Sequence, residues 1–205
     1  PAMISSRISR YLCHADIVLH DRLVPSEVLA LLSDKLVNVG KTGGQPSIPQ
    51  SEINRKMLME AERGRLVVRL QGGDPGIFGH LGEEVEFLSQ WNIRVDVVPA
   101  ASAAQVAAAR ARIPLTHRNY GRSITLATGH PAPGQDLPSF PGPEHGHLAL
   151  YMVTKNRKAV LQRLFDGGWP TEASVLVAEC IGTDEETSYF TTLQDLALQP
   201  IQSPA

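Results

Sequence analysis

Short apolar runs alternate with helix-like stretches through the first half of the chain, and this alternation restricts the possible fold more than any other feature. Helices are indicated where apolar residues recur at helical spacing, and strands where three to six mostly apolar residues stand together. A strand–helix alternation of this kind predicts a parallel sheet covered by helices on both faces. The expected strands are 17–19, 36–39, 66–71 and 95–98, and the expected helices are 26–32 (capped by Ser26), 49–64, 82–90 and 102–110.

The alternation stops at residues 113–121 and then begins again. The stretch 130–147 contains five prolines, which exclude a continuous helix or a central strand there. In this half the expected strands are 123–128, 148–153, 174–178 and 188–192, and the expected helices are 155–165 and a short one that begins at Leu193.

The break predicts an α/β protein of two lobes, 1–114 and 120–205, joined near residue 115. Ligands of this fold class bind in a cleft, so we expect one between the lobes. The first lobe would carry the main ligand-binding loop, and the second would complete the cleft.

The composition of the chain limits the classes of molecule that it is expected to bind. The chain has 205 residues, 42% of them hydrophobic and 20% charged, with a net charge of -2, so it gives no general attraction to nucleic acid or to a membrane surface. No apolar run is long enough to span a bilayer. Cys13 and Cys180 stand far apart, which favours a reducing, cytoplasmic setting and neither a disulfide framework nor a zinc site. The basic residues are mostly Arg, 14 against 5 Lys, and Arg suits carboxylate recognition.

The stretch "VVRLQGGDPGIFG", residues 67–79, runs a predicted strand directly into Gly72, Gly73 and Asp74. Ligands of open α/β sheets bind beyond the carboxyl ends of strands, where glycines allow a close approach to the backbone and Asp74 could accept hydrogen bonds. The alternative is a tight strand-to-helix turn with Asp74 as a cap. Neither common phosphate-loop motif is present, which disfavours a nucleoside triphosphate.

Read together with its neighbours, this loop resembles a known family. The similar segments are "ADIVLHDRLV" (15–24), "VGKTGGQPSIPQSEIN" (39–54), "VVRLQGGDPGIFG" (67–79), "GEEVEFL" (82–88), "VVPAASA" (97–103), "IPLTHR" (113–118) and "TLATGH" (125–130). Their order and spacing are similar to those of the tetrapyrrole methylases, especially the members that methylate uroporphyrinogen III. The resemblance implies S-adenosyl-L-methionine as methyl donor, S-adenosyl-L-homocysteine as its product, precorrin-2 as the methylated tetrapyrrole for sirohaem or cobalamin, and a homodimer.

The resemblance also implies roles for individual residues. Asp21 would accept a proton and Lys41 would donate one; read alone, Asp21 could instead cap a turn or pair with Arg22, and Lys41 could be a solvated loop charge. Met152 read alone would be strand core. The implied cofactor-binding residues are Pro1, Gly72, Gly73, Asp74, Ile77, Ser102, Ala103, Met152 and Gly182.

The substrate of such an enzyme carries several carboxylates, for which arginines are suitable partners. The candidates are Arg22, Arg112, Arg118 and Arg122, with His117 as a possible helper. His145 and His147 have ligand-like spacing, but the sequence offers no third ligand, so no metal site is expected.

Some positions depart from the family pattern. Pro1 aligns with the last residue of the family's first glycine loop, and the final residues align before its last strand, so we expect a fragment that lacks both strands and is poorly stable. Ala100 replaces a usual Gly and His80 a usual Arg, with further departures at Thr42 and Pro46. A later-step precorrin methyltransferase and a non-catalytic relative that binds a tetrapyrrole or S-adenosylhomocysteine remain alternatives. A nucleic-acid methyltransferase is disfavoured by the net charge.

Overall fold

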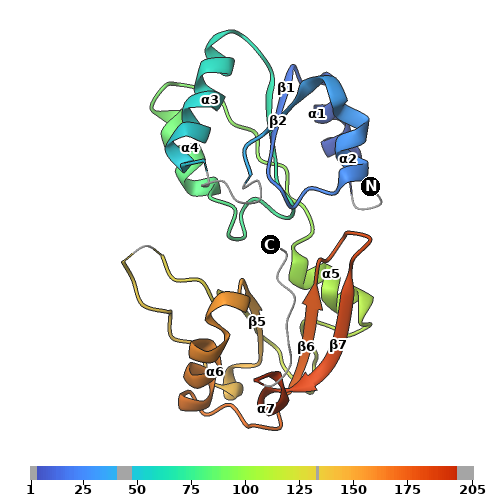
Figure 1. The fold of residues 1–205 in the computed structure, drawn as a ribbon, viewed down its shortest axis with the longest axis vertical. Coiled ribbons are helices and arrows are strands. Elements are labelled where there is room, and N and C mark those ends of the chain that lie inside the picture. The colour runs from blue at the N-terminus through green and yellow to red at the C-terminus, as the bar shows by residue number, and fades with distance from the viewer. Residues whose placement is uncertain (1–3, 41–47, 133, 198–205) are drawn as a thin grey trace. The chain divides into compact units, whose positions relative to one another are not determined.

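The computed structural model describes residues 4–40, 48–132 and 134–197. The chain divides into two compact units, Pro1–Ser102 and Ala103–Ala205, both built from helices and strands (Figure 1). The α/β class with two lobes is therefore confirmed. The division falls before the helix that follows Ser102, whereas the sequence placed it near residue 115, so this helix belongs to the second unit.

The first unit is organised around a three-stranded parallel sheet of order β2-β1-β3. In its central strand Leu19 pairs with Val37 on one side and Arg69 on the other. Because all three strands run in the same direction, their carboxyl ends lie at one edge of the sheet. The elements are α1 (Ser6–His14), β1 (Ile17–His20), α2 (Ser26–Leu29), the 3-10 helix Ala30–Lys35, β2 (Leu36–Asn38), α3 (Gln50–Glu62), β3 (Val67–Leu70) and α4 (Leu81–Ser89).

Strand β1 supplies the centre of this unit's core. Val18 and Leu19 are almost completely buried, and consecutive strand residues point to opposite faces of a sheet. Leu19 belongs to a cluster with residues of α3 and α4, whereas Val18 packs with Leu12 and Ala15 at α1. Helices therefore cover both faces of the sheet, as the alternation in the sequence predicted.

The structure differs from the sequence prediction at three places in this unit. Helix α1 was not predicted. Pro25, and not Ser26, occupies the cap position of α2, without a side-chain hydrogen bond. The predicted strand 95–98 is wrong, because a strand needs a hydrogen-bonded neighbour and the described residues supply none.

The segment that replaces the predicted strand is attached to α1 by a side chain. The Tyr11 hydroxyl donates to Asp96 Oδ2 at 2.5 Å. This hydrogen bond, and the charge of nearby Arg94, hold the pKa of Asp96 below its ordinary value.

The second unit contains a parallel strand pair, β4–β5, and an antiparallel pair, β6–β7. Its core surrounds one face of α6, where Val160, Leu161 and Leu164 are buried. The described residues of the proline-rich stretch form a loop, as predicted, and this loop includes a short 3-10 turn, Pro143–His145, that was not predicted. The elements are α5 (Ala103–Arg110), β4 (Ile124–Thr128), β5 (His147–Tyr151), the 3-10 helix Thr154–Asn156, α6 (Arg157–Asp166), β6 (Ser174–Glu179), β7 (Thr187–Thr192) and α7 (Leu193–Leu196).

The antiparallel pairing of β6 with β7 follows from the short segment between them. Residues 180–186 contain no helix, and a parallel return would need a longer crossover connection. Among the helices that the structure describes, none is both long and apolar enough to cross a membrane.

Candidate functional site

The carboxyl-end edge of the first sheet brings three loops together. Val39 N donates to His20 O at 2.9 Å, and Asp21 N donates to Leu70 O at 3.3 Å. The residues that follow β2 and β1 are thus hydrogen-bonded to the last residues of β1 and β3. The edge at which the sequence predicted ligand binding therefore exists in the fold, and the binding itself stays a prediction.

Asp21 connects two of these loops through its carboxylate. Oδ1 accepts from Leu23 N at 2.9 Å, and Oδ2 accepts from Gly72 N at 3.2 Å. The side chain therefore caps its own turn, as one interpretation of the sequence had it, and also holds the start of the glycine loop. Its role as a proton acceptor stays a prediction. Lys41 and Pro1 lie outside the described residues.

The two glycines of the loop have different local reasons to be glycine. A Cβ at Gly72 would lie 2.5 Å from Leu23 Cβ and 2.9 Å from Leu23 O, so the space beside Gly72 is filled by the chain itself. A Cβ at Gly73 would approach only Ala101 O, at 4.0 Å. The close approach of a ligand expected from the sequence therefore fits Gly73, whereas Gly72 serves the packing of the loop.

Asp74 is a structural centre of the same loop. Its Oδ1 accepts from Gly76 N at 2.8 Å, which makes it a turn cap, and its Oδ2 accepts from Ala100 N at 2.9 Å. Ile77 N donates to the Asp74 carbonyl at 3.1 Å. The carboxylate thereby ties the loop to the segment that leads into buried Ser102. Each carboxylate oxygen keeps a further lone pair for another donor.

The loop ends in a strained backbone. Phe78 and His80 have φ angles of 55° and 60°, in the left-handed region. The side chain of Gln71 donates to Gly79 O at 2.6 Å and so holds the loop against the end of β3. Strained residues that are held by their surroundings are frequent at functional sites.

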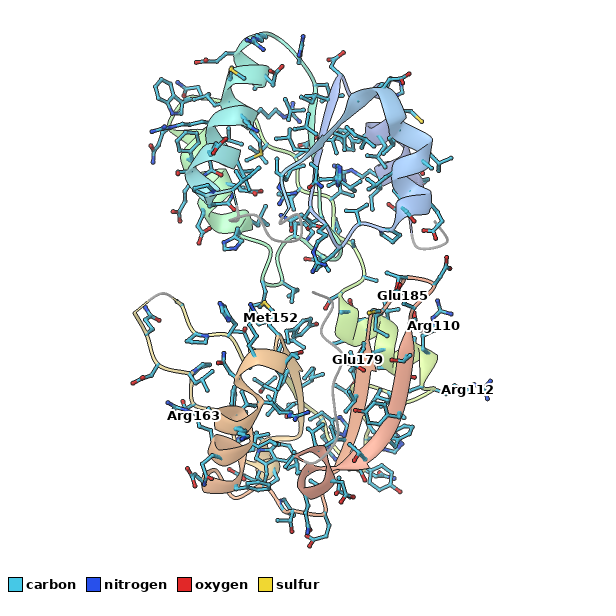
Figure 2. The ribbon with its side chains drawn as sticks, viewed as in Figure 1. Arg110, Arg112, Met152, Arg163, Glu179 and Glu185 are labelled. Atoms are coloured by element: carbon cyan, nitrogen blue, oxygen red, sulfur yellow. The ribbon has the colours of Figure 1, made fainter. Side chains whose placement is uncertain are left out.

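The predicted cofactor residues of the second unit follow its strands or begin its first helix. Met152 comes directly after β5 with a φ of 56° and is 53% exposed, so the interpretation of Met152 as strand core is wrong. Gly182 has a φ of 86°, which a side chain would disfavour, and its N–H donates to Glu186 Oε2 at 2.9 Å. Ala103 is the first residue of α5. Figure 2 labels Met152 beyond the end of β5 and Glu179 at the end of β6.

Two of the four predicted substrate arginines come together. Arg118 and Arg122 line, with Thr116 and His117, a surface depression of about 420 Å³. Arg122 Nε donates to Arg118 O at 3.3 Å, which fixes the second guanidinium relative to the first residue's backbone.

The remaining candidates do not join this depression. Arg112 is exposed and has a φ of 60°, and Arg22 is an exposed residue of the first unit. His147 Nδ1 lies 2.7 Å from Leu115 O, and the described residues contain no group of three His, Cys, Asp or Glu side chains placed to hold a metal ion.

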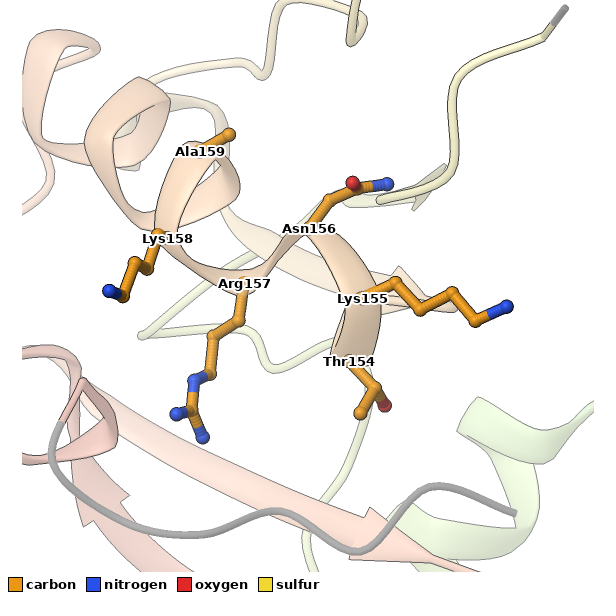
Figure 3. Close-up of a pocket in the computed structure, with 6 residues that line it drawn as sticks. All are labelled: Thr154, Lys155, Asn156, Arg157, Lys158 and Ala159. Atoms are coloured by element: carbon orange, nitrogen blue, oxygen red, sulfur yellow. The ribbon is translucent and has the colours of Figure 1, made fainter. Parts of the chain in front are cut away.

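A second depression, of about 360 Å³, is lined by residues 154–159 at the start of α6. Figure 3 shows the side chains of Lys155 and Lys158 pointing in opposite directions, with Arg157 directed elsewhere again. Because these cations do not converge, the depression is a weaker candidate for an anion than the one that Arg118 and Arg122 line.

Sequence reasoning missed a buried polar network beneath the glycine loop. Arg69 Nε donates to Glu84 Oε1 at 3.2 Å, and Gln50 Nε2 donates to the same oxygen at 3.0 Å and to Asn54 Oδ1 at 2.9 Å. One signal was available: Arg69 is a charged residue inside the otherwise apolar strand "VVRL". A charge at a half-buried strand position requires a partner.

Comparison with known proteins identifies the family. Residues 1–197 match the model of the tetrapyrrole (corrin/porphyrin) methylases. The chain is 39% identical to the chloroplastic S-adenosyl-L-methionine-dependent uroporphyrinogen III methyltransferase of Arabidopsis thaliana, covering 99% of this chain and 56% of that protein. It is 38% identical to the uroporphyrinogen-III C-methyltransferase of Paracoccus denitrificans, covering 100% of this chain and 73% of that protein. The chain thus spans little more than half of the Arabidopsis relative.

A solved structure with a similar fold belongs to a protein of the same kind. The uroporphyrin-III C-methyl transferase of Thermus thermophilus, complexed with S-adenyl homocysteine, matches with a TM-score of 0.82 and 30% identity over 100% of this chain and 89% of that chain. Since the family model, the curated relatives and this fold agree over nearly the whole sequence, the chain belongs to the tetrapyrrole (corrin/porphyrin) methylases.

Proposed function

We propose that the chain catalyses the S-adenosylmethionine-dependent C-methylation of uroporphyrinogen III to precorrin-2, a step toward sirohaem or cobalamin. The observation that carries the proposal is the pairing of Asp21 with the glycine loop: an acidic side chain is fixed by two backbone donors beside a strand end that is open at Gly73. The activities named for the Arabidopsis and Paracoccus relatives support the same reaction.

The residues present are suitable for the cofactor. The open side of Gly73 admits a ligand to the backbone, and the exposed, left-handed Met152 presents its backbone outside the core. S-adenosylmethionine supplies the methyl group, and the chain would bind and orient it. The residues that would hold it are Pro1, Gly72, Gly73, Asp74, Ile77, Ser102, Ala103, Met152 and Gly182.

The chain's own chemical task is the movement of protons. Methylation of a pyrrole ring carbon must be followed by loss of a proton from the macrocycle, and Asp21 is the proposed acceptor. The two N–H groups on its carboxylate fix its orientation while further lone pairs stay available. Lys41, which follows β2 in the sequence and lies outside the described residues, is the proposed donor.

We propose that arginine side chains bind the substrate's carboxylates. The depression lined by Arg118, Arg122, His117 and Thr116 provides two guanidinium groups and a hydroxyl for an anion. Arg22 and Arg112 are further proposed contacts. We also propose that the enzyme works in the cytoplasm as a homodimer, with no nucleic-acid or membrane partner.

The test is an anaerobic reaction of the chain with uroporphyrinogen III and S-adenosylmethionine, with the product mass measured. We expect a mass gain of two methyl groups. Asp21→Asn cannot act as the base and keeps an acceptor oxygen for only one of the two backbone donors, so turnover should fall about 10²- to 10⁴-fold; S-adenosylhomocysteine binding, measured in parallel, separates loss of the base from loss of the glycine loop. Unreduced turnover in this variant would contradict the role of Asp21.

Other outcomes separate the alternatives. Unchanged uroporphyrinogen III, together with S-adenosylhomocysteine binding, would reject the proposed substrate and favour a later precorrin substrate or a binding-only relative. Offering precorrin substrates then distinguishes these two. Absence of S-adenosylhomocysteine binding would reject the proposed function itself.

A further inference from the structure

A buried cluster of four polar side chains lies under the carboxyl-end edge of the first sheet. Glu84 is 5% exposed and Asn54 is 6% exposed, and the side chain of Arg69 is 16% exposed. Glu84 Oε1 accepts from both Arg69 and Gln50, and Gln50 also donates to Asn54. One carboxylate oxygen thus joins a residue of β3 to the first residue of α3 and to α4.

Arg69 extends the cluster to the backbone of the strand ends. Its Nη1 donates to Leu70 O at 3.1 Å and lies 3.4 Å from Leu19 O, which it also contacts as a donor. The same Leu70 carbonyl accepts the N–H of Asp21 at 3.3 Å. The guanidinium therefore holds the ends of β1 and β3 at the points where Asp21 and the glycine loop begin.

Stability alone does not explain such a cluster. A buried ion pair loses the hydration of both charges, and well-packed apolar residues of similar volume often give equal or greater stability. Arg69 and Glu84 lie where apolar side chains would extend the core around Leu19 and Leu88. Their advantage over apolar residues is directional: hydrogen bonds fix angles and registers that apolar contacts leave variable.

Glu60 provides an internal comparison. It is also buried, at 6% exposure, and is paired with Arg63 at 2.7 Å and Arg65 at 2.5 Å. Both of those arginines are about half exposed, and Arg65 precedes the amino end of β3, away from the carboxyl-end edge. Glu60 and Glu84 are thus two buried, ion-paired glutamates among the described residues of the first unit, and Glu84 lies beside the candidate site.

We propose that Arg69, Glu84 and Gln50 are positioning residues, which set the geometry of the carboxyl-end edge and act through Asp21 and the glycine loop without touching a ligand. Their effect on binding rests on the function proposed above, whereas their effect on the loops does not.

The test replaces the ion pair by apolar residues, Arg69→Met with Glu84→Leu. We expect the free energy of unfolding to be unchanged or raised. We expect amide hydrogen exchange, followed by NMR, to accelerate at least ~10-fold at Leu23 and Gly72, whose N–H groups bond to Asp21, but not at Val18 in the central strand. The affinity for S-adenosylhomocysteine should fall about tenfold as the loops lose their fixed arrangement.

A matched pair of single variants provides the control. Glu84→Leu and Glu60→Leu each remove a carboxylate that accepts from two side chains, at two similarly buried glutamates. Only Glu84→Leu should accelerate exchange at Leu23 and Gly72. Equal acceleration in both variants would mean general loosening of the unit and would overturn the proposal.

Unchanged exchange at Leu23 and Gly72 in the double variant would also overturn it. If the unsubstituted chain binds no S-adenosylhomocysteine, the proposed function fails, but the exchange comparison still decides whether Arg69 and Glu84 position the loops.

Discussion

The two units differ in whether their buried polar side-chain atoms have hydrogen-bond partners. In the first unit, buried Glu60, Glu84 and Asn54 each have hydrogen-bond partners. In the second, Glu179 Oε1, Tyr189 OH and Thr191 Oγ1 are buried atoms without a hydrogen-bond partner among the described residues. The buried polar groups of the first unit thus belong to hydrogen-bonded clusters, whereas these three buried atoms belong to partly exposed residues and have no such partner.

The topology of the strands explains the difference. In the first unit the ends of parallel strands meet helices that bring Gln50 and Glu84 to Arg69. In the second, Tyr189 pairs with Val177 and Thr191 with Val175, so these side chains share the sheet face that packs on the apolar core around α6. An apolar surface offers no hydrogen bonds. A parallel edge collects partners from several elements, whereas one face of a two-stranded ribbon meets only what packs on it.

The largest expected effect concerns the fit of the glycine loop in the first unit, where the Asp21 carboxylate binds Gly72. Gly72→Ala should lower the free energy of unfolding by about 1–3 kcal/mol, because the added methyl group meets Leu23. Gly73→Ala should change it by less than about 0.5 kcal/mol, because only Ala101 O lies near. Urea unfolding followed by Trp91 fluorescence, with Trp169→Phe as background, reports the first unit. Equal effects of the two variants would refute the distinction between these glycines.

In the second unit we expect a smaller change in the free energy of unfolding, and of the opposite sign. Tyr189→Phe removes a buried hydroxyl that lacks a partner, so it should leave stability unchanged or raise it by up to about 1 kcal/mol. The control is Tyr151→Phe, which removes the acceptor of Ala104 N at 3.3 Å and should cost about 0.5–1.5 kcal/mol. Urea unfolding followed by Trp169 fluorescence, with Trp91→Phe as background, measures both. A clear loss of stability in Tyr189→Phe would mean that its hydroxyl has a partner.

The smallest expected effect is a pH dependence of the free energy of unfolding that arises from Tyr189. Burial raises the pKa of Tyr189 above its ordinary value, and the charge of Glu179 raises it further, while Arg157 acts in the other direction. The neutral phenol is therefore favoured in the folded state, and this contribution is present below about pH 10 and lost as the pH rises through the folded-state value. The stability of the unsubstituted chain should fall relative to Tyr189→Phe as the pH rises above about 10 in urea titrations. A constant difference over this range would contradict the shift.

Much of the fold could be predicted from local sequence. Strands β1, β2, β3, β4, β6 and β7 lie close to their expected positions, because short apolar runs bounded by Gly, Pro and helical segments are a strong periodic signal. The loop 72–74 was expected at a strand's carboxyl end and lies there. The prediction of a strand at 95–98 was wrong although its residue composition is suitable for a strand. A strand also needs a neighbouring strand to share its hydrogen bonds, and local composition does not show whether that neighbour exists.

The features of the candidate site also divide into those that the sequence predicts and those that only the tertiary structure shows. The sequence by itself determined the family, the glycine loop and the acidic residue after β1, because these depend on residue type and order along the chain. Tertiary structure alone decided that Asp21 accepts from Gly72, that Gly72 packs on Leu23 while Gly73 stays open, and that Arg69 meets Glu84. These contacts join residues far apart in sequence, and their distances are set by how parallel strands and helices pack, which no single stretch of sequence encodes.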